Sequence, residues 1–334
     1  MDTSLCQSCS KIGTCASSAV ICLDCKEGLC KPCLNAHKEN PEYIIHRISE
    51  VNSNQRCMFV ASSINTSKDD VLPSLPILRF KFEREIDISY DGQIYVSSLA
   101  VTKDNRVILC NTRSKNLLVY NENGKHIQDC KLNGEPWDIA FIHGGSKAVV
   151  TLENMSAIQF IETSPTVNPG KSLSLPHKCY GVAVIHNHVY LGGRGSIYVI
   201  DNAGKPVTSF NLGVNGFVWY LHPGPSETLL FTSYDFDDVG SLNLKTGKFY
   251  FRCENKTIKG PEGITTDKSA NIYIACRDSE NIQRLTPTGV CQSIVLSSKD
   301  KIKRPYGLAF NSQCTQLYVA NNDGQTITIY LGFQ

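Results

Sequence analysis

We expect the 334-residue sequence to fold as a small zinc-stabilised module followed by an all-β six-bladed propeller. Two observations predict this architecture. Pairs of cysteine and histidine are concentrated in residues 6–46. From residue 77 onward, short apolar strands alternate with Gly, Asn and Asp turns, and one unit recurs about every 40 residues, the period of a four-stranded propeller blade. The expected organisation is a zinc module at 1–49, a linker at 50–76 and a propeller at 77–334.

The zinc module is predicted from four pairs of candidate metal ligands: Cys6, Cys9, Cys22, Cys25, Cys30, Cys33, His37 and His46. Together they can hold two tetrahedral zinc ions with no position left open for water, which is typical of structural sites. Ligation would replace the core that so short a segment lacks. A disulfide framework is the alternative. The two histidines, the odd total of 15 cysteines and a first stretch without the pattern of a signal peptide favour zinc in a reducing compartment.

The spacing C-x2-C-x4-C-x2-C-x3-H-x8-H, from Cys22 to His46, resembles the B-box zinc finger of tripartite-motif proteins. The resemblance implies a cross-brace, in which one zinc is bound by Cys6, Cys9, Cys30 and Cys33 and the other by Cys22, Cys25, His37 and His46. Many B-boxes have histidine where Cys9 stands, and Cys15 is expected to be a bystander. In that family the RING finger carries ligase activity and a coiled coil carries dimerisation. Neither pattern is found, so we expect a monomer without autonomous ubiquitin transfer.

The propeller is predicted from six copies of a strand-rich unit, whose equivalent positions are Leu99, Ile139, Val182, Trp219, Ile264 and Leu308. Each copy has three apparent strands, and a fourth follows in several of them. Residues 260–284 resemble an NHL repeat, which implies an NHL-like propeller. The last copy stops after three strands, which would leave an unpaired edge. Residues 77–88 form a strand-like run without a blade of its own, and we expect them to complete the sixth blade.

The resemblance to NHL-like blades also implies a candidate binding face. In such blades, the residue before the glycine that opens the inner strand lies near the mouth of the central channel. Those positions are Ser97, Trp137, Tyr180, Phe217, Glu262 and Tyr306. Loops on the same face carry both basic and acidic residues, including Arg113, Arg194 and Arg277. The aromatic side chains either plug the channel as core or form a platform that binds peptide or single-stranded nucleic acid.

Three functions are compatible with these features. The first is a zinc-binding adaptor that recognises a protein or RNA ligand on the propeller face without catalysis. The second is a component of a ubiquitin ligase that works with a RING finger supplied by a partner. The third is a metal-dependent propeller hydrolase or lyase, for which the mouth offers only Glu262 with Asp138. Isolated histidines are expected at turns and not in a zinc site, namely His143, His177, His186, His188 and His222.

Charge and hydropathy narrow the expected partners. The formal net charge of +2 gives no bulk attraction to nucleic acid or to membranes. A membrane-spanning helix needs an apolar run of about 18 residues, and none is present. We therefore expect a cytoplasmic adaptor with two structural zinc ions and with protein or RNA partners.

Overall fold

The computed structural model describes residues 20–22, 27–29, 48–50, 78–88, 94–142, 144–213, 215–253 and 256–333. The chain divides into two compact units, Met1–Ser74 and Leu75–Gln334. In the first unit, three short strands form a sheet in the order β2-β1-β3, with bounds Val20–Cys22 (β1), Glu27–Leu29 (β2) and Ile48–Glu50 (β3). Apart from the backbone of Cys22 in β1, the expected zinc ligands lie outside the described residues: Cys6, Cys9, Cys25, Cys30, Cys33, His37 and His46.

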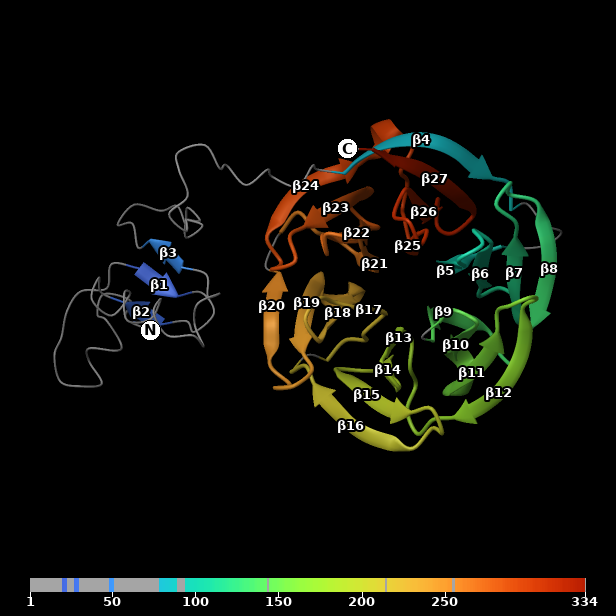
Figure 1. Cartoon of the computed structure of the whole chain (residues 1–334), viewed down its shortest axis with the longest axis horizontal. Helices are drawn as coiled ribbons and strands as arrows, with labels where there is room; N and C mark the ends of the chain where they lie inside the picture. Colours follow the sequence, from blue (N-terminus) through green and yellow to red (C-terminus); the bar gives the residue numbers. More distant parts are fainter. Residues whose placement is uncertain are drawn as a thin grey trace. The chain divides into compact units, whose positions relative to one another are not determined.

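The second unit is an all-β six-bladed propeller, in which six four-stranded antiparallel sheets surround a central axis (Figure 1). Blade 1 contains β5 (Val96–Val101), β6 (Val107–Asn111), β7 (Asn116–Tyr120) and β8 (His126–Lys131). Blade 2 contains β9 (Pro136–Phe141), β10 (Lys147–Leu152), β11 (Ala157–Glu162) and β12 (Asn168–Ser174). Blade 3 contains β13 (Val182–Ile185), β14 (His188–Gly192), β15 (Ser196–Asp201) and β16 (Pro206–Asn211). Blade 4 contains β17 (Tyr220–Pro223), β18 (Thr228–Ser233), β19 (Asp238–Asn243) and β20 (Phe249–Cys253). Blade 5 contains β21 (Pro261–Thr266), β22 (Ile272–Cys276), β23 (Asn281–Leu285) and β24 (Cys291–Leu296). Blade 6 contains β25 (Leu308–Phe310), β26 (Gln316–Asn321), β27 (Thr326–Phe333) and β4 (Arg79–Ile86).

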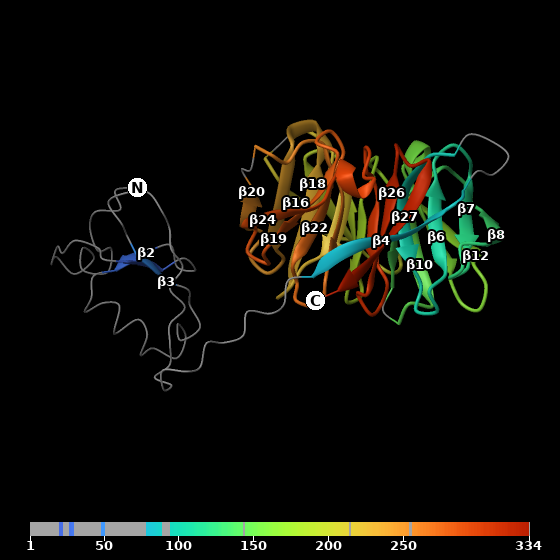
Figure 2. The ribbon, with the colours of Figure 1, turned by 90° about the horizontal axis from the view of Figure 1, so that it is seen from above.

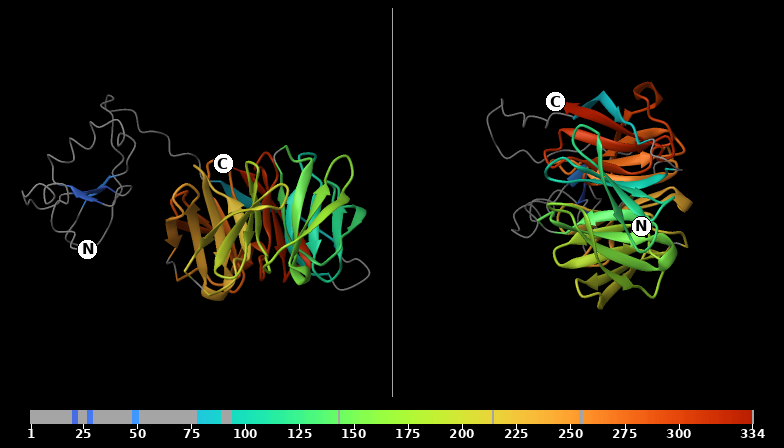
Figure 3. Two further views of the ribbon diagram at one scale, coloured as in Figure 1. Left: turned by 90° about the horizontal axis from the view of Figure 1, so that it is seen from below. Right: turned by 90° about the vertical axis from the view of Figure 1, so that its right-hand side faces the viewer.

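Three short 3-10 helices complete the described elements: η1 (Glu153–Met155), η2 (Tyr234–Phe236) and η3 (Ser298–Asp300). The strands of each blade run between the two faces of the propeller (Figure 3). In the described part of the chain, no helix is long and apolar enough to cross a membrane.

Burial follows the position of each strand within its blade. All five residues of β6 and of β22 are buried, because the second strand of a blade is covered by the neighbouring blades on both sides. Outer strands such as β8 and β24 alternate between more and less exposed side chains. The turns between the third and fourth strands reuse one device, in which the Oδ1 atom of Asn121, Asp201 or Asn243 accepts backbone N–H groups two to four residues later.

The propeller ring is closed by pairing of its two ends, as the sequence predicts. β4 pairs antiparallel with β27, from Ile86 opposite Ile327 to Arg79 opposite Phe333 (Figure 2). Blade 6 therefore takes its outer strand from the start of the propeller and its other three strands from the end. Phe80 of β4 packs edge-on against Tyr273 of blade 5, at 5.6 Å between ring centroids. The closing strand therefore also contacts a second blade.

The predicted alignment of the fourth repeat on Trp219 is wrong by two residues. Leu221 faces Phe231 across the β17–β18 ladder, in the register at which Leu99 faces Leu109 in blade 1. The preceding segment, residues 216–218, pairs with the loop after β14, where Val218 N–H donates to the Gly193 carbonyl at 3.0 Å. This extra pairing moves β17 along the sequence. The mouth residue of blade 4 is therefore Trp219, and Phe217 lies beside it.

Candidate functional site

The mouth of the channel is formed where the inner strands of the six blades begin. We use "mouth residues" for Ser97, Trp137, Tyr180, Trp219, Glu262 and Tyr306, and "neck residues" for those that follow them, Ser98, Asp138, Gly181, Tyr220, Gly263 and Gly307. The blades come closest at the neck. A Cβ atom on Gly181 would lie 2.8 Å from the Cα atom of Tyr220, and one on Gly307 would lie 2.8 Å from the Cα atom of Ser98. Glycine is required there for this close approach.

The side chain of Tyr220 crosses the channel at the neck. Tyr220 of blade 4 donates its hydroxyl to the carbonyl of Ser97, 2.8 Å away in blade 1 on the opposite side of the ring. Trp137 of blade 2 donates its indole Nε1–H to the carbonyl of Trp219 at 3.2 Å. These two bonds close the channel beneath the mouth, so the propeller presents a floor there and not an open pore.

Aromatic side chains from blades 2 to 4 form one packed cluster on this floor. The ring of Tyr180 lies 5.3 Å from that of Trp137, 4.4 Å from that of Trp219 and 5.0 Å from that of Phe217. Trp137 and Tyr180 are buried, whereas Phe217 and Trp219 are half-buried. Trp137 and Tyr180 thus belong to the core of the propeller. Phe217 and Trp219 present aromatic surface to the solvent.

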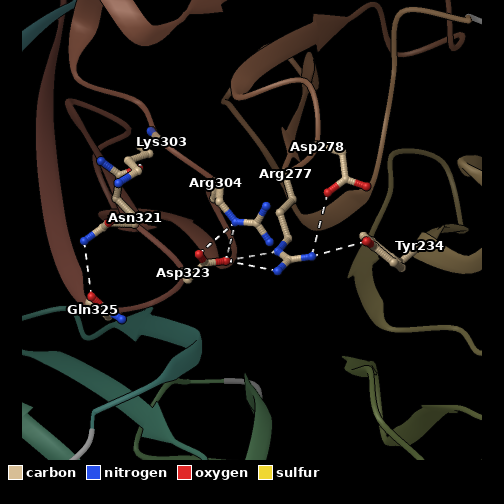
Figure 4. Close-up of polar contacts among 9 residues, drawn as sticks. Tyr234, Arg277, Asp278, Lys303, Arg304, Asn321, Asp323 and Gln325 are labelled. Carbon is tan, nitrogen blue, oxygen red and sulfur yellow. Dashed lines mark hydrogen bonds and ion pairs between the residues drawn. The ribbon is translucent and has the colours of Figure 1, made fainter.

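The other half of the mouth, from blades 5 and 6, is polar. Arg277 pairs with Asp323 at 3.0 Å (Figure 4). Its guanidinium also lies over the ring of Tyr306, 5.0 Å from the ring centre. The Nε atom of Arg304 lies 2.8 Å from both oxygens of the same Asp323 carboxylate, so the two cations share one anion, and Arg277 also reaches further partners. Those partners are the Tyr234 hydroxyl at 3.2 Å and the Asp278 carboxylate at 3.7 Å. Arg277, a predicted ligand-face residue, is therefore neutralised within the propeller.

A carboxyl group and an indole N–H at the mouth are candidate ligand contacts. Glu262 is buried, and burial raises the pKa of its carboxyl well above its usual range; Arg277 opposes the shift, and Asp278 and Asp235 reinforce it. The indole Nε1–H of Trp219 is buried, and it finds no acceptor in the part of the chain that the structure describes. A buried N–H of this kind is costly unless a bound molecule or water completes it.

Exposed cations border both halves of the mouth. Arg113 lies 5.6 Å from the ring centre of Tyr95, and Lys178 lies 5.0 Å from that of Tyr180. Arg194 donates its Nε–H to the Asn215 carbonyl at 3.1 Å. The structure therefore brings the predicted Arg113 and Arg194 to the rim of the mouth. The sequence did not identify Tyr95, Lys178 or Trp219 as residues of the mouth. For Trp219, the sequence feature that could have done so is its position two residues after the aromatic Phe217.

The remaining titratable residues named from the sequence lie elsewhere. Asp138 is buried at the neck, where its carboxylate accepts hydrogen bonds from blades 1 and 3. His222 lies in β17 and not at a turn as expected, because it follows the corrected start of that strand. Within the described ranges, no three His, Cys, Asp or Glu side chains are grouped as metal ligands would be.

Comparison with known proteins gives the fold. No family model and no curated protein matches the chain. A virginiamycin B lyase from Staphylococcus aureus is similar with a TM-score of 0.59 and 14% identity, over 76% of this chain and 99% of that one. A streptogramin B lyase structure is similar with a TM-score of 0.59 and 14% identity, over 77% of this chain and 98% of that one. A hydrazine synthase from Kuenenia stuttgartiensis is similar with a TM-score of 0.55 and 11% identity, over 72% of this chain and 97% of that one. At such identities the likeness supports the propeller fold alone.

Proposed function

We propose that this chain is a zinc-binding adaptor whose propeller recognises a protein ligand at its mouth, similar to tripartite-motif proteins that lack a RING finger. The unpartnered indole N–H of Trp219 supports this function best. It is a buried donor without an acceptor among the described residues, and the half-buried ring of Phe217 lies 5.8 Å from the ring of Trp219, a combination typical of interface centres. The zinc-binding part of the proposal rests on the spacing of the Cys and His pairs.

A protein ligand fits the charge of the mouth better than a phosphate backbone does. Arg277 and Arg304 are paired with Asp323, and Lys259 is paired with Asp237 at 2.6 Å. These cations are compensated within the propeller and offer less attraction to phosphate. The buried Glu262 lies near Arg277, Asp278 and Asp235. It would repel an anion when ionised and bind a hydrogen-bond donor of a peptide in either state.

RNA is the second candidate, and one observation favours it. Arg113 and Lys178 lie exposed over aromatic rings at the rim, and Arg194 is exposed between β14 and β15 of blade 3. Cations combined with aromatic surfaces are the usual elements of single-strand binding. Treatment of captured complexes with ribonuclease separates the two candidates, because an RNA ligand would be lost and a directly bound protein would remain.

Lyase or hydrolase chemistry has less support in the geometry. Glu262 and Asp138 are the acidic residues that the sequence offers for it. Asp138 lines the cavity beneath the neck, whereas Glu262 is coupled to the charged loops of the mouth. The two carboxyl groups therefore do not converge on one cavity, as a pair of catalytic acids would.

The test compares the wild-type chain with Trp219→Ala and with Glu262→Gln in quantitative capture and crosslinking. Tyr250→Ala is the matched control, because Tyr250 is an exposed aromatic residue on the outer strand β20. If the ligand binds at the mouth, Trp219→Ala should weaken its binding free energy by ~1–3 kcal/mol, the usual cost of truncating a stacked aromatic anchor. Ligands captured equally by wild type and both mouth variants would contradict the proposal.

A further inference from the structure

A cavity of about 390 Å³ lies on the other side of the neck from the aromatic cluster. The inner strands of all six blades line it, mostly with small and apolar side chains such as Ala100, Ala140, Val182, Ile264 and Leu308. The lining continues to Pro223, the last residue of β17, and to Cys314, beyond the end of β25. Tyr220, which crosses the channel, also lines the cavity. We call this cavity the lower funnel.

Asp138 supplies a carboxylate to the closed end of the lower funnel. Its Oδ1 atom accepts from the Ser98 hydroxyl at 2.6 Å and from the Ile139 N–H at 2.9 Å. Its Oδ2 atom accepts from the Val182 N–H at 2.9 Å. A carboxylate oxygen has two acceptor positions, so Oδ2 retains one. No basic side chain in the described part of the chain pairs with Asp138, and burial raises the pKa of its carboxyl to about 7.

The wall of the funnel adds a second acceptor. The Nδ1 atom of His222 lies 2.7 Å from the Pro223 carbonyl, which can only accept, so Nδ1 carries the proton. Nε2 is then an acceptor, 3.5 Å from the Thr265 hydroxyl. Burial lowers the pKa of this ring to about 4, so His222 is neutral near pH 7. Asp138 and His222 therefore both accept hydrogen bonds in the funnel, and neither supplies a positive charge.

We propose that the lower funnel binds an aliphatic primary amine, with the ammonium group on Asp138 and the hydrocarbon stem along the apolar wall. A buried carboxylate in an apolar cavity lacks a counter-charge, and an ammonium ion supplies both that charge and hydrogen-bond donors. The apolar wall takes up the methylene groups, which favour burial. The amine is either a small free molecule or the side chain of a lysine on a protein. This site is separate from the mouth and does not depend on the function proposed there.

The first test measures binding by calorimetry with the whole 334-residue chain, purified in the presence of zinc. Pentylamine is expected to bind, and pentanol, which has the same stem without the charge, is expected to bind at least tenfold more weakly. Affinity for pentylamine should rise between pH 6 and pH 8 as Asp138 ionises, because the amine stays protonated. Cys110 and Tyr220 are the titratable groups coupled to Asp138, and burial raises the pKa of each, so neither changes charge in this range.

Two variants decide whether the binding is in the funnel. Asp138→Asn should reduce pentylamine affinity at least tenfold, whereas Asp129→Asn on the outer strand β8, the same chemical change, should leave it unaltered. Ala309→Leu fills part of the funnel and keeps Asp138, so it should also weaken binding and decides the matter if Asp138→Asn does not fold. Pentylamine affinity equal to that of pentanol, or unaltered in the folded variants, would overturn the proposal.

A parallel titration with N-acetyl-lysine methylamide separates the two sources of the amine. Affinity similar to that of pentylamine would assign the funnel to lysine side chains of a protein. Binding of pentylamine without binding of the lysine derivative would assign it to small free amines. Absence of binding by both probes up to millimolar concentration would refute the site.

Discussion

At the scale of single residues, the mouth shows what repeat alignment can and cannot reach. Trp137, Tyr180, Glu262 and Tyr306 are placed correctly because each lies two residues before an apolar position of a regular inner strand. Trp219 is missed because the segment before β17 pairs with a loop of blade 3. Local periodicity carries no information on such a long-range pairing. The hydrogen bond from Tyr220 to Ser97 across the channel is also a long-range contact that local periodicity does not predict.

The aromatic cluster should divide into residues for folding and residues for binding. Trp137 is buried among Tyr180, Trp219 and Tyr220, so Trp137→Ala should lower the free energy of unfolding by ~3–5 kcal/mol. Phe217 is half-buried, and Phe217→Ala should cost less because its site is open to solvent. Urea unfolding of the two variants measures the difference. Equal losses would show that Phe217 is as much a core residue as Trp137.

Asp138 should make stability fall as pH rises. Burial raises the pKa of its carboxyl from 3.8 to about 7, so between these values the folded chain holds a proton that the unfolded chain has lost. The free energy of unfolding should therefore decrease from pH 4 to pH 7, by up to about 1.4 kcal/mol per pH unit from this residue. Urea unfolding across this range, compared with Asp138→Asn, isolates its share, because Glu262 contributes in the same direction. An unchanged slope in the variant would contradict the assignment.

At the scale of elements, β4 is a strand that belongs to blade 6 but comes from the start of the propeller. Its position could be predicted because the last repeat lacks a fourth strand and residues 77–88 lack a blade. Removing Arg79–Ile86 should lower the free energy of unfolding by more than about 4 kcal/mol, because β27 loses its partner and Phe80 no longer packs on Tyr273.

The control for this deletion removes eight residues, 60–67, from the segment expected to be a linker. Thermal unfolding followed by circular dichroism should show a large loss of melting temperature only for the deletion of β4. If both deletions unfold at the wild-type temperature, the ring does not depend on β4 for closure.

At the scale of the whole molecule, the chain combines two units, and the sequence predicts that they are stabilised in different ways. The propeller has a hydrophobic core between each pair of neighbouring blades, such as the cluster around Ile108 of blade 1 and Val150 of blade 2. The N-terminal unit, Met1–Ser74, contains the Cys and His pairs and few large apolar residues. The periodicity of apolar residues predicts the packing between the blades of the propeller. The spacing of the Cys and His pairs is the basis for expecting zinc to stabilise the N-terminal unit.

Chelation should therefore separate the two units. We expect two zinc ions per chain by elemental analysis, and a chelator should unfold the N-terminal unit, since zinc ligation contributes ~10–16 kcal/mol to modules of this type. The propeller should keep its melting temperature, because its described residues contain no group of metal ligands and its blades pack on apolar side chains. Differential scanning calorimetry with and without chelator measures both transitions. Cys25→Ser should reproduce the effect of the chelator, whereas Cys314→Ser in the propeller should not. A content of one zinc or none in the wild-type chain, or loss of the propeller transition on chelation, would contradict this division.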